Sequence, residues 1–66
     1  MKVTYDARTD TVTVTFREGA TIAESDEGRS GAILDYDERG ELVSLEVVDA
    51  SSRITEPRKV EFQTTT

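Results

Sequence analysis

The chain has 66 residues, a formal net charge of −6 and a hydrophobic share of 35%, and it contains neither Cys nor His. These values exclude disulfides, thiolate or imidazole metal ligands and Ser-His catalysis, and the negative charge argues against a nucleic-acid partner. The sequence has no stretch of about 18 apolar residues and no basic-then-apolar opening, so we expect neither a membrane span nor a secretory signal. The length predicts one domain with a thin core.

The first two predicted strands, residues 2–5 and 11–16, alternate between apolar and polar side chains. A period of two residues is typical of a strand with one buried and one wet face. A slip of one residue would turn the valines toward water, so the apolar positions determine the expected register. The expected cross-strand pairs are Tyr5–Val12 and Val3–Val14.

The segment from residue 17 to residue 31 has no regular period. Glu18-Gly19 is typical of a turn, and residues 21–24 can form a short strand after it. The polar, glycine-containing stretch 25–31 predicts a loop.

Residues 32–36 and 41–48 predict a second hairpin around a turn that ends at Gly40. A glycine at the last turn position supplies the left-handed backbone that such a turn needs. We expect the register of this hairpin to pair Asp37 with Glu41.

This register leaves apolar side chains on both faces of the second hairpin. One face carries Ile33, Val43, Leu45 and Val47. The other face carries Leu34, Tyr36, Leu42 and Val48. The second face needs a cover, so we expect a homodimer with the latter four residues as its interface. The alternative cover is the C-terminal segment 54–62.

The C-terminal part predicts one short helical turn near residues 49–54, which Pro57 limits, and a last strand at 58–62. The fold class is therefore mainly β: a small antiparallel meander of about five strands, with an α+β fold carrying a short C-terminal helix as the alternative. Residues 1–62 form the expected domain, and residues 63–66 form a frayed tail. The predicted core consists of Val3, Tyr5, Val12, Val14, Phe16, Ile33, Val43, Leu45 and Val47.

The block GAILDYDERGELVSLEVVDAS at residues 31–51 resembles the pattern G-x-I-x-D-Y-D-x-x-G-x-x-V-x-x-E-I-x-x-A-S of the DUF2283 family of small bacterial and archaeal proteins. The opening MKVTYD is similar to the start of that family, and the resemblance covers roughly residues 1–54. It implies a small cytoplasmic protein built mainly from an antiparallel sheet, of unknown function and without established catalytic residues. Members are sometimes encoded near small toxin-like proteins, which implies an antitoxin-like role.

Charged side chains of the second half are candidates for a polar site. They are Asp35, Asp37, Glu46, Asp49 and Arg53. Clustered carboxylates can hold Ca²⁺ or Mg²⁺, and the segment 35–40 begins like an EF-hand loop. Arg39 puts a cation among these carboxylates, so solvated turn residues are the favoured interpretation and no metal site is assigned.

Asp35 is a separate case because the expected register turns it toward Val43 and Leu45. An inward carboxylate is costly unless it is paired or hydrogen-bonded. It is therefore either a general acid/base or a structural group that reaches water or accepts backbone N–H groups. Arg53 can pair with Asp49 in a capped turn or bind an anion.

No nucleophile–base constellation is present, so the sequence leans against an enzyme and predicts no catalytic residue and no cofactor. The favoured function is that of an acidic, non-catalytic protein-interaction module that self-associates. One alternative is an antitoxin-like regulatory partner of a small basic protein. The other is a carboxylate-based metal-dependent binder or enzyme. Neither nucleic acid nor membrane is an expected partner.

Overall fold

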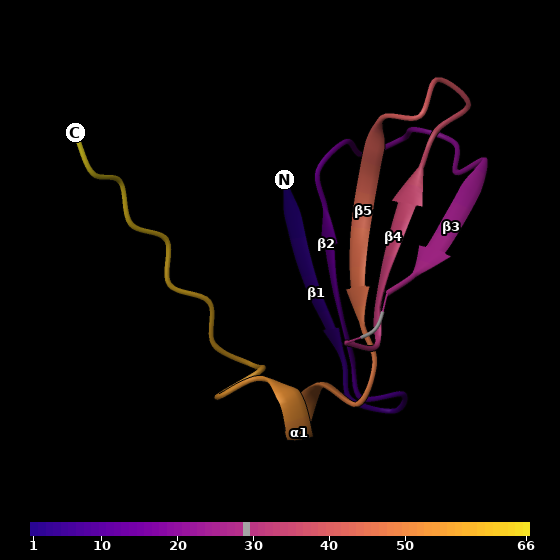
Figure 1. Ribbon diagram of the computed structural model, residues 1–66. Coiled ribbons are helices and arrows are strands. Elements are labelled where there is room, and N and C mark those ends of the chain that lie inside the picture. The colour runs from indigo at the N-terminus through magenta and orange to yellow at the C-terminus, as the bar shows by residue number, and fades with distance from the viewer. Residues whose placement is uncertain (29) are drawn as a thin grey trace.

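Five strands and one helical turn form in chain order, as Figure 1 shows for the computed structural model, which describes residues 1–28 and 30–66. They are β1 (Lys2–Asp6), β2 (Thr11–Thr15), β3 (Glu24–Glu27), β4 (Ala32–Tyr36), β5 (Leu42–Val47) and α1 (Ala50–Arg53). The strands make one antiparallel sheet in the order β1-β2-β5-β4-β3. The mainly β fold class is thereby confirmed, with a single short helix.

The first hairpin has the predicted register, with Tyr5 opposite Val12 and Val3 opposite Val14. The strand order departs from a simple meander at one place, because β2 pairs with β5 rather than with β3. The chain leaves β2 at Phe16, whose N–H donates to the carbonyl of Val43 at 2.8 Å, and then crosses the end of the sheet to reach β3.

The predicted register of the second hairpin is wrong by one residue. The turn itself is as expected: the N–H of Asp37 donates to the carbonyl of Glu41 at 2.9 Å, and Gly40 has φ +80°. Beyond the turn, a β-bulge shifts the register between Asp35 and Tyr36. One extra residue in a strand turns the residues beyond it to the opposite faces. Past the bulge, residues of β4 and β5 that were predicted on the same face therefore lie on different faces.

The third strand lies at Glu24–Glu27, so it begins at the last residue of the strand predicted at 21–24 and continues into the predicted loop 25–31. It pairs with β4 and puts Ser25 opposite Asp35. The hydroxyl of Ser25 donates to Asp35 Oδ1 at 2.6 Å, so a polar contact and not apolar alternation stabilises this strand. Arg29, also in the predicted loop, lies outside the described residues.

The predicted helical turn is present as α1, but Asp49 makes no side-chain bond to its N-terminus. Asp10 has that role, because the N–H and the hydroxyl of Ser51 donate to its carboxylate at 3.1 and 2.6 Å. The hydroxyl of Tyr5 donates to the same carboxylate at 2.7 Å. Asp10 thus joins the first hairpin to the helix.

The strand predicted at 58–62 does not form; Arg58 contacts Tyr5, and the C-terminal end of the chain runs clear of the sheet (Figure 1). The buried hydrophobic residues are Val12, Val43 and Ala50, which is a smaller core than predicted. Phe16 is 41% exposed, and most of the other predicted core residues are half-buried. One sheet layer cannot enclose its own apolar face, since domains generally pack two layers together.

Candidate functional site

Two rows of apolar side chains run across the sheet from β1 to β4. Opposite residues of an antiparallel pair share one face, so the register of the sheet defines these rows. The first row is Val3, Val14, Leu45 and Leu34. The second row is Tyr5, Val12, Val47 and Ala32. We call these eight residues the apolar face.

No other element of the described chain packs over the apolar face. The sheet is a single layer, and α1 lies at one end of it (Figure 1). The C-terminal segment contacts the face at Tyr5, where the guanidinium of Arg58 lies 5.1 Å from the centre of the ring. Beyond that point Val60 and Phe62 are 65% and 80% exposed, so this segment does not cover its own sheet.

The predicted interface residues fall into two groups. Leu34 belongs to the apolar face, and Tyr36, two residues along β4, points to the same side. Leu42, the first residue of β5, lies opposite Tyr36 and shares that side, whereas Val48 follows the end of β5; each is more than one-third exposed. The prediction that Leu34 and Leu45 lie on different faces of the hairpin is wrong, because Leu34 lies directly opposite Leu45 and shares its face.

The opposite face of the sheet is polar and contains the buried carboxylate of Asp35. This residue faces away from Leu45, contrary to the expected register, and lies opposite Ser44. It is 1% exposed, and its two oxygens accept bonds from Ser25 at 2.6 Å and from Ser44 at 2.7 Å. Neighbouring side chains satisfy Asp35, so its burial needs no backbone donor from the turn.

Glu46 shares the polar face with Asp35 and hydrogen-bonds to it. Burial acts to raise the pKa of Asp35, but the hydrogen bonds from Glu46, Ser25 and Ser44 outweigh it and hold that pKa below its usual value. The same bond to Asp35, together with burial, raises the pKa of Glu46. The two carboxyl groups therefore bind a proton as a pair, with Glu46 as its carrier.

The other predicted polar-site residues lie apart from this pair. Asp37 lies in the turn between β4 and β5, two residues beyond Asp35, where Arg17 donates to it at 2.6 Å and lowers its pKa to about 2. Asp49 has a left-handed backbone before α1, with φ 53°. Arg53 donates to the carbonyl of Ser30. Among the described residues, no three Asp or Glu side chains are grouped closely enough to hold a metal ion.

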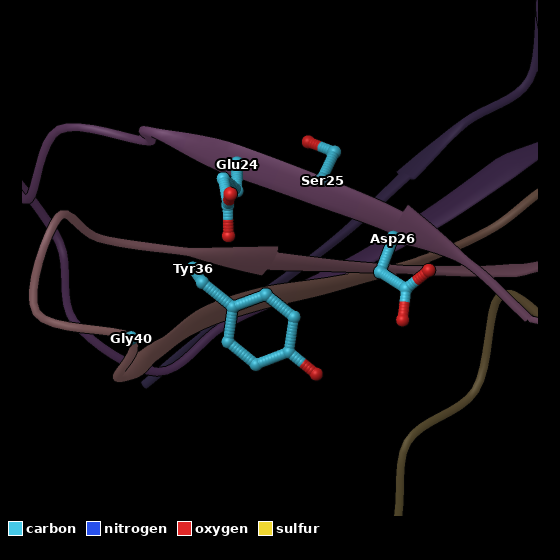
Figure 2. A pocket seen from close by; sticks show the side chains of 5 residues that line it. All are labelled: Glu24, Ser25, Asp26, Tyr36 and Gly40. Carbon is cyan, nitrogen blue, oxygen red and sulfur yellow. The ribbon is translucent and has the colours of Figure 1, made fainter.

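A shallow depression of about 500 Å³ lies beside β3 and is drawn in Figure 2. Glu24 and Asp26 point to the same side of the sheet as Tyr36, whereas Ser25 points to the other side. The two carboxylates therefore form an acidic border next to the apolar face. The depression offers carboxylates and a phenol, without a nucleophile and base in contact.

Sequence reasoning missed Ser25 and Ser44 as partners of Asp35. The available signal was Ser44 itself, a small polar residue inside an otherwise apolar strand. A serine there is explained if the strand turns that position toward a polar group. The bulge that produces this orientation has no comparable mark in the sequence.

A family model described as "Protein of unknown function (DUF2283)" matches residues 2–51 of the chain. Neither the comparison with curated proteins nor the comparison with solved structures finds a match. No helix in the described part of the chain is long and apolar enough to cross a membrane.

Proposed function

Because the chain belongs to the DUF2283 family, whose description assigns no activity, we propose its function from its surfaces: it is a protein-interaction module that forms a homodimer through the apolar face. The observation that carries the proposal is the single-layer sheet with eight apolar residues on a face that no described helix or strand covers. Val12 among them is buried by its neighbours, six are half-buried and Val3 is 38% exposed. A second sheet layer would bury that face, as in β-sandwiches.

A second copy of this chain is the occupant that fits best. It presents the same uncovered apolar face, and a two-fold axis brings identical surfaces together. No charged residue interrupts the two apolar rows between β1 and β4. Charge enters at the β3 edge, with Asp26 opposite Leu34 and Glu24 opposite Tyr36. An uncharged centre with an acidic border is typical of a protein interface.

The net charge of −6 opposes association and makes it depend on salt. Two such chains repel, but at physiological ionic strength charges are screened beyond about 8 Å. Burial of apolar surface contributes roughly 25 cal/mol per Å² and does not weaken with salt. The dimer should therefore tighten as the salt concentration rises.

Sedimentation equilibrium of the full chain tests the proposal. The expected mass at micromolar concentration is twice the chain mass of 7.3 kDa, with a dissociation constant that falls as NaCl increases. A mass of 7.3 kDa at high micromolar concentration, in both low and high salt, would contradict it.

The β3 edge supports a second candidate function, the binding of a basic protein. All four residues of the sequence Glu24-Ser25-Asp26-Glu27 are exposed at the end of the sheet. Within the described residues, none of the three carboxylates of β3 takes part in an ion pair. A lysine-containing strand can add to such an edge by backbone hydrogen bonds and charge pairing.

Titration with a peptide of alternating Lys and Val, followed by amide NMR, tests this second function. Shifts centred on β3, lost in the double variant Glu24→Gln and Asp26→Asn, are the expected result. Shifts centred on β1, or none at millimolar peptide, would exclude the β3 edge as the binding site.

A further inference from the structure

The segment after α1 is an extended arm that carries apolar side chains away from the sheet. It begins at a turn in which Glu56 has φ 57° and the N–H of Lys59 donates to the carbonyl of Glu56 at 3.0 Å. The arm then extends into open space (Figure 1), with Val60 and Phe62 largely exposed. An exposed alternating segment of this kind is suited to strand pairing.

The edge of β1 offers a place for such a strand. β1 is the terminal strand of the sheet, so one flank of its backbone has no strand partner in the described chain. Its five residues, Lys2–Asp6, contain no proline. Val3 and Tyr5 lie on the apolar face, and Lys2 and Asp6 are the charged positions at its two ends.

We propose that residues 59–63 of one copy form an added strand antiparallel to β1 of a second copy, an inference that rests on the homodimer proposed above. In the register that pairs all five residues of β1, Val60 and Phe62 extend the apolar face of the partner. The opposite residues are then Lys59–Asp6, Val60–Tyr5, Glu61–Thr4, Phe62–Val3 and Gln63–Lys2. Lys59 meets the carboxylate of Asp6, and Glu61, opposite Thr4, has Lys2 and Asp6 as its two diagonal neighbours.

Orientation and register follow from the charges. A parallel strand with the same apolar phase would set Lys59 against Lys2, two like charges that repel directly opposite one another. Moving the antiparallel strand by two residues toward the end of the arm sets Glu61 against Asp6, with the same penalty. Every strand pair in the sheet is already antiparallel, so the added strand continues its pattern.

The interface area favours a strand donated to the partner over one folded back on its own chain. Five strands spaced by about 4.8 Å, with about five residues each, give a face of roughly 400 Å², or about 800 Å² for two copies. Specific interfaces commonly bury about 1,200–2,000 Å². The C-terminal end of the arm also lies away from its own β1 (Figure 1). Two exchanged arms would supply much of the missing area.

Engineered thiols test the proposal directly, because the natural chain has no Cys. The Thr4→Cys and Glu61→Cys variants are prepared separately, mixed and oxidised. Opposite residues of an antiparallel pair lie within disulfide distance. The mixture should give a mixed disulfide between the two introduced thiols, identified by peptide mass mapping. Its yield should exceed by at least tenfold that of the control mixture of Thr4→Cys with Gln63→Cys.

Equal yields from the two mixtures would overturn the register. A further variant carries both Thr4→Cys and Glu61→Cys in one chain. If it forms a disulfide within the monomer, and the mixture of single variants gives no mixed disulfide, the arm lies on its own β1 and the exchange is overturned. A chain ending at Arg58 should dimerise at least tenfold more weakly; an unchanged dissociation constant would overturn the arm's role while leaving the face-to-face dimer intact. A monomeric full chain would instead defeat the proposed function.

Discussion

The hydroxyl of Ser44 lies 2.7 Å from Oδ2 of Asp35, across the pair formed by β4 and β5. This bond identifies the register that separates the two faces of the sheet. It sets a polar group of β5 against a polar group of β4, and the next pair along is Leu45 with Leu34. The polar face thus satisfies its carboxylate internally, and the apolar face is left uncovered.

Ser44→Ala should lower the free energy of unfolding by about 1–3 kcal/mol, because it leaves a buried carboxylate oxygen without its donor. Urea denaturation measures the change. Thr4→Ala, on the exposed outer strand, is the matched control and should cost a few tenths of a kcal/mol. Equal losses in the two variants would mean that the Ser44–Asp35 bond does not stabilise the fold.

Glu46→Gln should raise the free energy of unfolding at pH 7. The pKa of Glu46 is raised in the folded chain. The stability that its protonated carboxyl group contributes is therefore fully present below the unfolded pKa of 4.5, and it is lost as pH rises through the folded pKa. A glutamine donates to Asp35 at every pH, so the gain should vanish below pH 4.5. Urea titrations from pH 3 to 8, with Glu38→Gln as the charge control, test this. A variant less stable than the parent at pH 7 would contradict it.

Asp37→Asn should destabilise the fold at neutral pH and lose that effect in acid. Arg17 holds the folded pKa of Asp37 at about 2, below its ordinary value of 3.8. Stability from this ion pair is therefore complete above pH 3.8 and disappears as pH falls through about 2. The difference between parent and variant, followed by urea denaturation, should shrink over that interval. A constant difference down to pH 1.5 would argue against the ion pair as its cause.

Gly40→Val should cost about 1–2 kcal/mol from backbone strain alone. Gly40 has φ +80°, and an added Cβ meets nothing within 4 Å, so the Cβ itself adds no crowding to the strain. Thermal melts of the parent chain, Gly40→Val and Gly40→Asn measure the cost. Asparagine tolerates the left-handed region, so Gly40→Asn should lower the melting temperature less than Gly40→Val does. Coincident melts of the valine variant and the parent would disprove the strain.

The sequence predicts most where side-chain alternation is regular. Val12 and Val14 between threonines determine the β1–β2 register, and the structure confirms it. The β4–β5 register fails because a bulge adds a residue without a composition signal, and this reverses the face assigned to Asp35. β3 has no apolar period, so its pairing depends on a serine–aspartate bond that only the assembled sheet reveals.

The apolar face could be predicted only in outline. An excess of apolar side chains in the second hairpin predicts that something covers them; the structure places most of them on one face, with Asp35, Ser44 and Glu46 on the other. Which residues share the uncovered face depends on the register, and therefore on the bulge. Leu34 and Leu45, predicted on opposite faces, are direct neighbours.

Leu34 and Ile33 test the homodimer most directly, because they are adjacent in β4, both half-buried, and on opposite faces of the sheet. Sedimentation equilibrium would compare Leu34→Glu with Ile33→Glu, with circular dichroism to establish that each retains its β spectrum. Val3→Glu, at a position that is 38% exposed on the outer strand, serves if Leu34→Glu does not fold. We expect a folded monomer for the apolar-face variant and a dimer of parental strength for Ile33→Glu. A folded Leu34→Glu or Val3→Glu variant that dimerises as tightly as the parent chain would contradict it.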